Sequence, residues 1–300
     1  MMVESFMRYI QYEKNYSSHT VISYHNDLLQ FKDFVERETG EAFDPVQIDR
    51  DIVRNWMVEL SQGGMEVSSV KRKISALRSF FKYLKREGEI TESPLCLITL
   101  PKIRKKLPVF VREEQMDFLI DDIDFGDDFR GVRDRLLLLV FYSTGVRRSE
   151  LLGMRDDDVD FFNSTIKVTG KGNKQRLIPF GEELRELMVR YQDIRSREVK
   201  GKPGAFFVQE SGEPMSASQV YKTVTKYLSM VSSLSKKSPH VLRHSFATAM
   251  LGSGADLTAV KELLGHSTLS STEVYTHISA REIMMNYNQA HPRAKKEKGG

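Results

Sequence analysis

Residues 239–250 read PHVLRHSFATAM, and residues 263–277 read LLGHSTLSSTEVYTH. His240 and Arg243 are three residues apart, and Tyr275 stands nine residues beyond His266. An arginine keeps its proton, and its planar fork matches phosphate oxygens. A tyrosine can form a covalent intermediate with the group that it attacks. This stretch therefore holds most of the groups needed to attack a phosphodiester, and the rest of the chain must supply what it lacks.

Composition sets broad limits on the 300-residue chain. Hydrophobic residues make up 40% and charged residues 29%, which is typical of globular proteins. The net charge is only +4, so a nucleic-acid surface would be local rather than global. The single Cys96 excludes an internal disulfide and fits a reducing compartment. No apolar run could cross a bilayer and no signal peptide is recognisable, so a cytoplasmic protein is expected.

A short charged segment divides the chain into two expected domains. Residues 101–108 read PKIRKKLP, with a proline at each end and four cations between them. Prolines disfavour helix in the preceding residue, so this segment reads as an extended linker. We therefore predict an N-terminal domain over residues 1–100, a linker over residues 101–108 and a second domain over residues 109–300.

The first domain has the apolar spacing of a helical bundle. Ser17–Thr20 suits a capped helix start, and residues 51–60 and 68–84 continue the helical pattern. Beside the apolar stripe of the last helix runs a stripe of cations: Lys71, Arg78, Lys82 and Lys85. Such a stripe is often only a solvated face. Because most acidic residues of the domain fall elsewhere, we favour contact with DNA phosphates.

The second domain is expected to mix helices with a small antiparallel sheet. Residues 133–142 read as a buried helix, and strands are predicted over residues 159–162, 165–169 and 175–179. Lys171 lies in the glycine-rich turn between the last two strands. A lysine there could protonate a leaving alkoxide, although an exposed turn lysine is the ordinary reading.

A second arginine, Arg147, is expected at a tight turn between two helices. Gly145 is expected to end a helix, because glycine is favoured at the position with positive φ that follows one. Glu150 is a nearby candidate partner for Arg147. An ordinary salt bridge between helices remains open here. His240 and His244 have the spacing of a zinc-binding pair, but the glutamate of a His-Glu-x-x-His motif is missing between them. The sequence also has no cysteine cluster, so a zinc site is disfavoured. We predict no metal and no cofactor.

Taken together, these residues resemble the active site of a known family. The set comprises Arg147, Lys171, His240, Arg243, His266 and Tyr275, and it resembles that of the tyrosine recombinases (phage integrase family), closest to the Xer branch of XerC- and XerD-like enzymes. The surrounding words TGVRRSEL, TGKGNKQR, PHVLRHSFAT, LLGH and STEVYTH match too. Val146 and Arg148 depart slightly from the more usual residues.

The resemblance implies a mainly α fold in two parts. A helical SAM-like core-binding domain and a catalytic domain would form a C-shaped clamp on duplex DNA. Four protomers, of one kind or of two paralogues, would assemble on two sites. Strands would be cut and rejoined through a 3′-phosphotyrosyl bond and a Holliday junction, without metal or ATP.

The resemblance also implies a role for each residue. Arg147 and Arg243 would hold the non-bridging phosphate oxygens, and Lys171 would protonate the leaving 5′ oxygen. His240 would help remove the proton of Tyr275, and His266 would donate a hydrogen bond to phosphate. Glu150 would orient its neighbours.

Further contacts are expected outside the catalytic set. The last helix, residues 281–289, would dock onto a neighbouring protomer. The expected DNA contacts are Lys71, Arg78, Lys82, Lys85, Lys102, Arg104, Lys105, Lys106 and Lys174.

Several functions stay open at this point. A Xer-type enzyme would resolve chromosome or plasmid dimers at a dif-like site, with or without a DNA translocase. A mobile-element integrase or DNA invertase would use the same chemistry. The chain begins directly with the clamp domain and leaves no room for an arm-binding domain, so we expect a Xer enzyme or a simple invertase rather than a phage-lambda-like integrase. The other rivals are a non-catalytic DNA-binding protein on the same fold and a metal-dependent nuclease.

Overall fold

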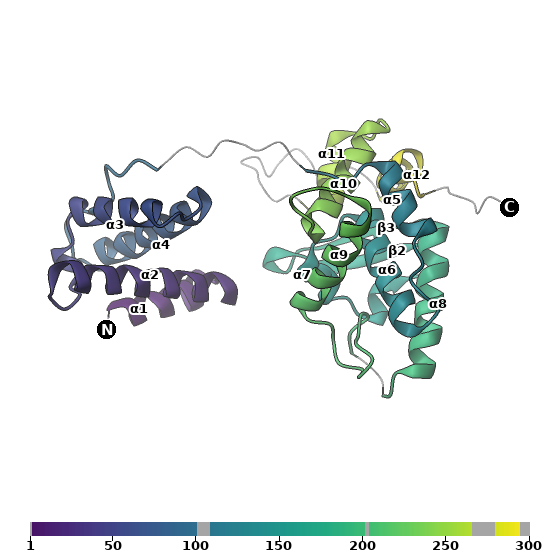
Figure 1. The fold of residues 1–300 in the computed structure, drawn as a ribbon, viewed down its shortest axis with the longest axis horizontal. Coiled ribbons are helices and arrows are strands. Elements are labelled where there is room, and N and C mark those ends of the chain that lie inside the picture. Colours follow the sequence, from purple (N-terminus) through teal and green to yellow (C-terminus); the bar gives the residue numbers. More distant parts are fainter. Residues whose placement is uncertain (1, 101–108, 202–203, 266–279, 295–300) are drawn as a thin grey trace. The chain divides into compact units, whose positions relative to one another are not determined.

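The structure is a computed structural model that describes residues 2–100, 109–201, 204–265 and 280–294, without the side chains of Lys171 and residues 280–284. The chain divides into two compact units, Met1–Lys106 and Leu107–Gly300 (Figure 1). Both units are mainly helical, and the second contains a three-stranded sheet. The expected fold class, mainly α with a small antiparallel sheet, is thereby confirmed. No helix in the described ranges has the length and apolar character needed to span a membrane.

The N-terminal unit is a bundle of helices around an aromatic core. In chain order it contains α1 (Met2–Arg8), η1 (Tyr9–Glu13), α2 (Ser18–Thr39), η2 (Pro45–Gln47), α3 (Arg50–Gln62) and α4 (Val67–Arg86). The Ser17 hydroxyl accepts a hydrogen bond from the Thr20 N–H, so the expected capped start is confirmed. Phe31 and Trp56 pack with ring centroids 4.9 Å apart in the core.

A buried ion pair joins α2 to α4. Asp27 is only 1% exposed, and its carboxylate accepts a hydrogen bond from Lys73 Nζ at 3.0 Å and another from Arg72. A buried carboxylate requires such partners because burial disfavours an unpaired charge. Arg72 and Lys73 of α4 therefore pair with this carboxylate, and neither is a member of the basic stripe.

The second unit is built around one buried helix. It contains α5 (Glu113–Asp117), η3 (Phe118–Asp122), α6 (Phe129–Thr144), α7 (Arg148–Leu152), η4 (Asp156–Asp158), α8 (Glu182–Glu198), α9 (Ala217–Val231), α10 (Pro239–Gly252), α11 (Leu257–Leu264) and α12 (Ala280–Ala290). The residues from 136, within α6, to 146, two residues beyond its end, are all buried. The helix packs against α8 and α10. This central position fixes the end of α6, where Arg147 follows.

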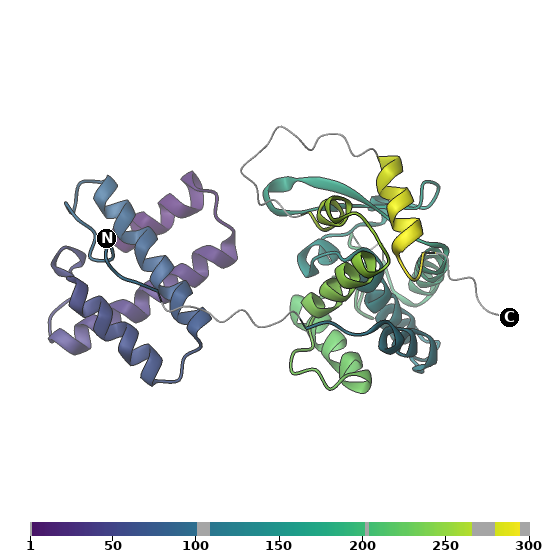
Figure 2. The same ribbon diagram turned by 90° about the horizontal axis from the view of Figure 1, so that it is seen from above.

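The sheet is antiparallel in the order β1 (Val159–Asp160), β2 (Thr165–Thr169) and β3 (Gln175–Pro179). The second and third strands have the expected bounds. The first strand is shorter than the expected 159–162, because the chain turns after Asp160. The Asp160 carboxylate accepts a hydrogen bond from the N–H of Asn163 at 2.9 Å in this turn. β3 contacts α11 and α12, and Figure 2 shows the sheet beside these helices.

The described part of α12 packs within its own unit. It contacts α10, α11 and β3, and Tyr287 is fully buried there. His291 stacks on Tyr287 with ring centroids 5.2 Å apart, and Arg293 pairs with Asp117, Asp121 and Glu183. The docking of this helix onto a neighbouring protomer remains a prediction, and the side chains of Ile283 and Met284 are not described.

Candidate active site

The turn between α6 and α7 places Arg147. Gly145 ends α6 with φ of 60°, a left-handed conformation that favours glycine. A Cβ on Gly145 would lie 2.5 Å from Cδ1 of Phe246, so only glycine allows α10 to pack this closely. The turn is therefore held against α10, and this packing fixes the position of the Arg147 backbone that follows it.

Glu150 of α7 is buried and accepts four hydrogen bonds. Its Oε1 accepts from Nη1 of Arg147 at 2.8 Å and from Nη1 of Arg176 at 2.9 Å. Its Oε2 accepts from the Arg147 backbone N–H at 2.8 Å and from Nη2 of Arg176 at 2.9 Å. The expected pairing of Glu150 with Arg147 is thereby confirmed. Burial opposes ionisation of Glu150, but the hydrogen bonds from Arg176 and Arg147 outweigh it and lower the pKa to about 2.

Three guanidinium groups converge on the last turn of α11. The consecutive carbonyls of residues 263–265 accept, in that order, from Arg176 at 2.6 Å, Arg243 at 2.5 Å and Arg147 at 2.7 Å. The last carbonyls of a helix have no partner within it and carry partial negative charge. Cations from the N-cap of α7, from β3 and from α10 therefore meet at the end of α11.

The cluster has an excess of positive charge. The three guanidinium groups have one carboxylate beside them, that of Glu150, which pairs with Arg147 and Arg176, so two positive charges are unbalanced among these described side chains. Burial and the charge of Arg147 lower the pKa of Arg243 to about 10, so it stays protonated at neutral pH. Preorganised cations of this kind are suited to an anion, and above all to a phosphate.

His240 lies in the first turn of α10, after Ser238 at the N-cap and Pro239. Its side chain is partly exposed to solvent. Partial burial and the positive charges of Arg148 and His244 lower the pKa of His240. The imidazole is therefore neutral at neutral pH and can accept a proton.

Other expected site residues are described only in part. The backbone of Lys171 lies in η5 (Lys171–Asn173), in the hairpin between β2 and β3, but its side chain is not described. His266 and Tyr275 lie outside the described residues, as do Lys102, Arg104, Lys105 and Lys106. The structure thus brings Arg147, Arg243 and Glu150 together, and the other roles stay predictions.

Arg176 was missed by the sequence analysis. It lies in β3 opposite Val168 of β2, within the word TGKGNKQR that supported the family resemblance. The basic hairpin was read through Lys171 and Lys174 alone. Alternation along β3 could have indicated that Arg176 is turned differently from Gln175 and Leu177, but its partner on α7 is not visible in the sequence.

Only part of the basic stripe of α4 is exposed and available to bind DNA. Lys82 and Lys85 are exposed, and Lys71 is half-buried. Arg78 instead donates a hydrogen bond to the carbonyl of Ile98 at 2.5 Å, so it already has a partner inside the unit. Lys174 is exposed in the hairpin turn.

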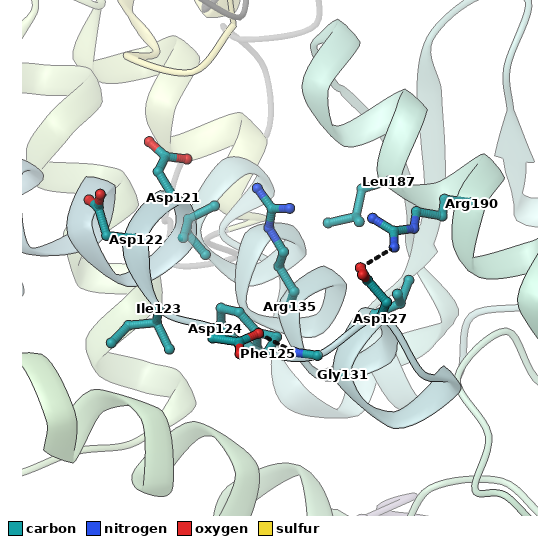
Figure 3. Close-up of a pocket in the computed structure, with 13 residues that line it drawn as sticks. Asp121, Asp122, Ile123, Asp124, Phe125, Asp127, Gly131, Arg135, Leu187 and Arg190 are labelled. Atoms are coloured by element: carbon teal, nitrogen blue, oxygen red, sulfur yellow. Dashed lines mark hydrogen bonds and ion pairs between the residues drawn. The ribbon is translucent and has the colours of Figure 1, made fainter.

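A hollow of about 270 Å³ lies elsewhere in the second unit, beside the loop that joins η3 to α6 (Figure 3). Asp127 at its rim pairs with Arg190 at 2.6 Å, and Asp124 accepts the N–H of Gly126 at 2.8 Å. Figure 3 shows Arg135 among these residues. Within the described ranges, no group of three or more His, Cys, Asp or Glu side chains could hold a metal ion.

Comparisons with known proteins cover almost the whole chain. A family model described as "Phage integrase family" matches residues 110–282, and one described as "Phage integrase, N-terminal SAM-like domain" matches residues 3–88. Tyrosine recombinase XerC of Chlorobaculum tepidum is 37% identical over 314 residues, covering 96% of this chain and 94% of that protein. Tyrosine recombinase XerC of Bacillus subtilis is 38% identical over 299 residues, covering 98% and 97%.

Solved structures show the same fold. The XerH site-specific recombinase bound to difH substrate, in a pre-cleavage complex, has a TM-score of 0.69 and 26% identity, covering 94% of this chain and 83% of that one. The Tn1549 transposon integrase in complex with transposon right end DNA has a TM-score of 0.70 and 20% identity, covering 94% of this chain and 96% of that one. The latter likeness concerns the fold alone.

Proposed function

The chain belongs to the phage integrase family and is a tyrosine recombinase, and from that premise we propose that it cuts and rejoins duplex DNA through a covalent bond to Tyr275. The observation that carries this proposal is the cluster of three arginines at the end of α11, beside which the described residues place one carboxylate, that of Glu150. Two of the three, Arg147 and Arg243, are the ones expected to hold the scissile phosphate.

The cleavage step transfers the phosphate from a DNA oxygen to the tyrosine. A bond forms between the Tyr275 oxygen and phosphorus while the bond between phosphorus and the 5′ oxygen breaks. The tyrosine pKa is normally about 10, so its proton needs an acceptor during attack. The neutral imidazole of His240 is that acceptor in our proposal. Lys171 protonates the leaving 5′ oxygen, and His266 donates to a phosphate oxygen.

The arginines stabilise the charge that grows on the phosphate. A guanidinium has five N–H donors, and Arg147 and Arg243 each use two side-chain nitrogens on protein oxygens. Their remaining N–H groups are available to the non-bridging oxygens. The freed 5′ hydroxyl of one strand then attacks the phosphotyrosine of the partner strand. Bond energy is conserved, so the reaction needs no ATP, and the two arginines supply the charge stabilisation that a metal ion would otherwise give.

We assign the Xer-type role to this enzyme, namely dimer resolution at a dif-like site in the cytoplasm. The XerC relatives are 37–38% identical over nearly the full chain. This likeness favours the Xer role over a mobile-element integrase or an invertase. The complex of XerH with difH supports a DNA partner for this chain. A tetramer, of one protein or with a paralogue, completes the proposal.

The test of this function is recombination of a plasmid that carries two copies of a site selected for binding from a randomised library. We expect Holliday junctions and recombinant circles in excess chelator and without ATP. Cleavage that appears only with a divalent metal ion would contradict the proposal and favour a metal-dependent nuclease. Binding without any strand exchange would favour a non-catalytic DNA-binding protein.

Lys82 and Lys85 provide a prediction for DNA contact. Both are exposed on α4, so we expect Lys82→Ala or Lys85→Ala to weaken binding to most sequences. Each change should lower the slope of log Kobs against log salt by about one, since one phosphate contact is lost. Filter binding at several salt concentrations measures that slope.

The control is Lys32→Ala, which removes a lysine of α2 that pairs with Glu36. We expect its slope to match that of the unchanged protein. A change of sequence preference in the Lys82 or Lys85 variant, with an unaltered slope, would refute the phosphate contact.

A further inference from the structure

Arg176 is the member of the arginine cluster that has no role in the proposed reaction. Its guanidinium lies on β3, and its side chain is 15% exposed. Its Nη1 and Nη2 grip the two oxygens of Glu150 at 2.9 Å each, and its Nε donates to the carbonyl of Leu263 at 2.6 Å. All three nitrogens are therefore engaged with protein oxygens.

Glu150 stands between the two arginines that share it. An ionised carboxylate offers about four lone-pair positions, and all four hydrogen bonds to Glu150 come from Arg147 and Arg176, two from each. The two from Arg176 fix the plane of the carboxylate, because a bidentate pair permits little rotation. The two from Arg147 then hold its backbone and its guanidinium on that fixed plane.

Two glycines leave the space that the Arg176 guanidinium and the Glu150 carboxylate occupy. A Cβ on Gly265, which has φ of 62°, would lie 2.9 Å from Nη1 of Arg176. A Cβ on Gly170 would lie 3.2 Å from Oε1 of Glu150. The ion pair thus fits between two glycines, one after α11 and one at the hairpin that carries Lys171.

We propose that Arg176 is a positioning residue for strand cleavage, because it holds the Glu150 carboxylate in the orientation that seats Arg147. This inference rests on the proposed function. Arg176 itself has no assigned contact with DNA. It acts through Glu150 on the arginine that grips the phosphate, and through the carbonyl of Leu263 on the end of α11.

Loss of Arg176 should change the proton affinity of Glu150. The charged groups that act on this carboxylate in the described part of the chain are Arg147 at the start of its own helix, Arg176 on β3 and Arg243 on α10. Without Arg176, burial remains while two of four donors are lost, so the pKa of Glu150 rises from about 2. Glu150 is then protonated at pH values below the raised pKa and becomes a carboxylate again above it.

The test is the rate of covalent adduct formation by Arg176→Met on a nicked suicide duplex that carries the selected site, between about pH 5 and pH 8. We expect a rate about 10- to 100-fold below that of the unchanged protein, as for other residues that orient a reacting group. DNA affinity should change little. The loss should be largest at the acid end and should shrink as the pH rises. Arg176→Lys, which keeps the charge but not the fork, should restore part of the rate.

Two controls separate positioning from damage to the fold. Arg185→Met removes a half-buried arginine of α8 that donates to Ser164 at 2.7 Å and pairs with Glu182, and it should leave the rate unchanged. Glu150→Gln combined with Arg176→Met should abolish the additional pH dependence and should react no more slowly than Glu150→Gln alone. Thermal unfolding of each variant reports on folding, and if Arg176→Met is unfolded, Arg176→Lys serves for the same comparison.

The outcomes distinguish this inference from the proposed function. If the unchanged protein forms no adduct, the proposed function fails. If it forms the adduct and Arg176→Met reacts at the same rate, only the positioning role fails. Equal losses in Arg176→Met and Arg185→Met, or strictly additive losses with Glu150→Gln, would also overturn it.

Discussion

Arg243→Lys should lower the rate of DNA cleavage by about 10²- to 10³-fold, the usual effect of losing one preorganised donor to a developing oxyanion. Lysine keeps the positive charge but lacks the planar fork. In the structure Arg243 is buried and bonds the carbonyls of Gly145 and Leu264, which hold its guanidinium at the junction of α6, α10 and α11. A single ammonium group cannot reach both carbonyls and the phosphate. Single-turnover adduct formation on the suicide duplex measures the rate.

Arg195→Lys is the matched control. Arg195 is equally buried in α8, where it donates to the carbonyl of Phe206 at 2.7 Å and pairs with Asp156 at 2.6 Å. We expect its variant to cleave at nearly the rate of the unchanged protein, with a comparable loss of stability. If both lysine variants lost activity to the same extent, the effect of Arg243→Lys would reflect folding and not catalysis.

The local features of this fold were predictable from the sequence. β2 and β3 alternate and flank a turn rich in glycine, so both strands have the expected bounds. Ser17 caps α2, and Gly145 ends α6 with positive φ. Each of these features depends on residues close together in the chain, which is why a pattern could reveal them. The pairing of Arg147 with Glu150, three residues apart, belongs to the same class.

The remaining features depend on contacts between distant segments. Arg176 meets Glu150 across 26 residues and Leu263 across 87, so no local pattern could identify its partners. Arg78 was expected on DNA because it follows the spacing of the stripe, yet it donates to the Ile98 carbonyl. The helix α1 was also missed, because its seven residues are too few for a helical pattern to stand out.

Tyr275→Phe should abolish cleavage completely. The phenol oxygen of Tyr275 is the only protein atom in the proposed reaction that bonds to phosphorus, and phenylalanine has no atom in its place. Histidine, lysine and arginine partners would still bind the DNA, so affinity for the selected site should stay nearly the same. Binding measured by gel shift, beside cleavage measured on the same duplex, separates the two effects. Residual cleavage in this variant would mean that another group is the nucleophile.

The most direct test of the account is a protein–DNA adduct that survives denaturation. The unchanged protein and Tyr275→Phe are each incubated with the nicked suicide duplex, in excess chelator, and separated by denaturing electrophoresis. We predict an adduct linked through a 3′ phosphate for the unchanged protein, with peptide mapping of the DNA-linked peptide to Tyr275, and none for the variant. An unchanged protein that binds the site but forms no adduct, or a Tyr275→Phe variant that forms one, would contradict the account.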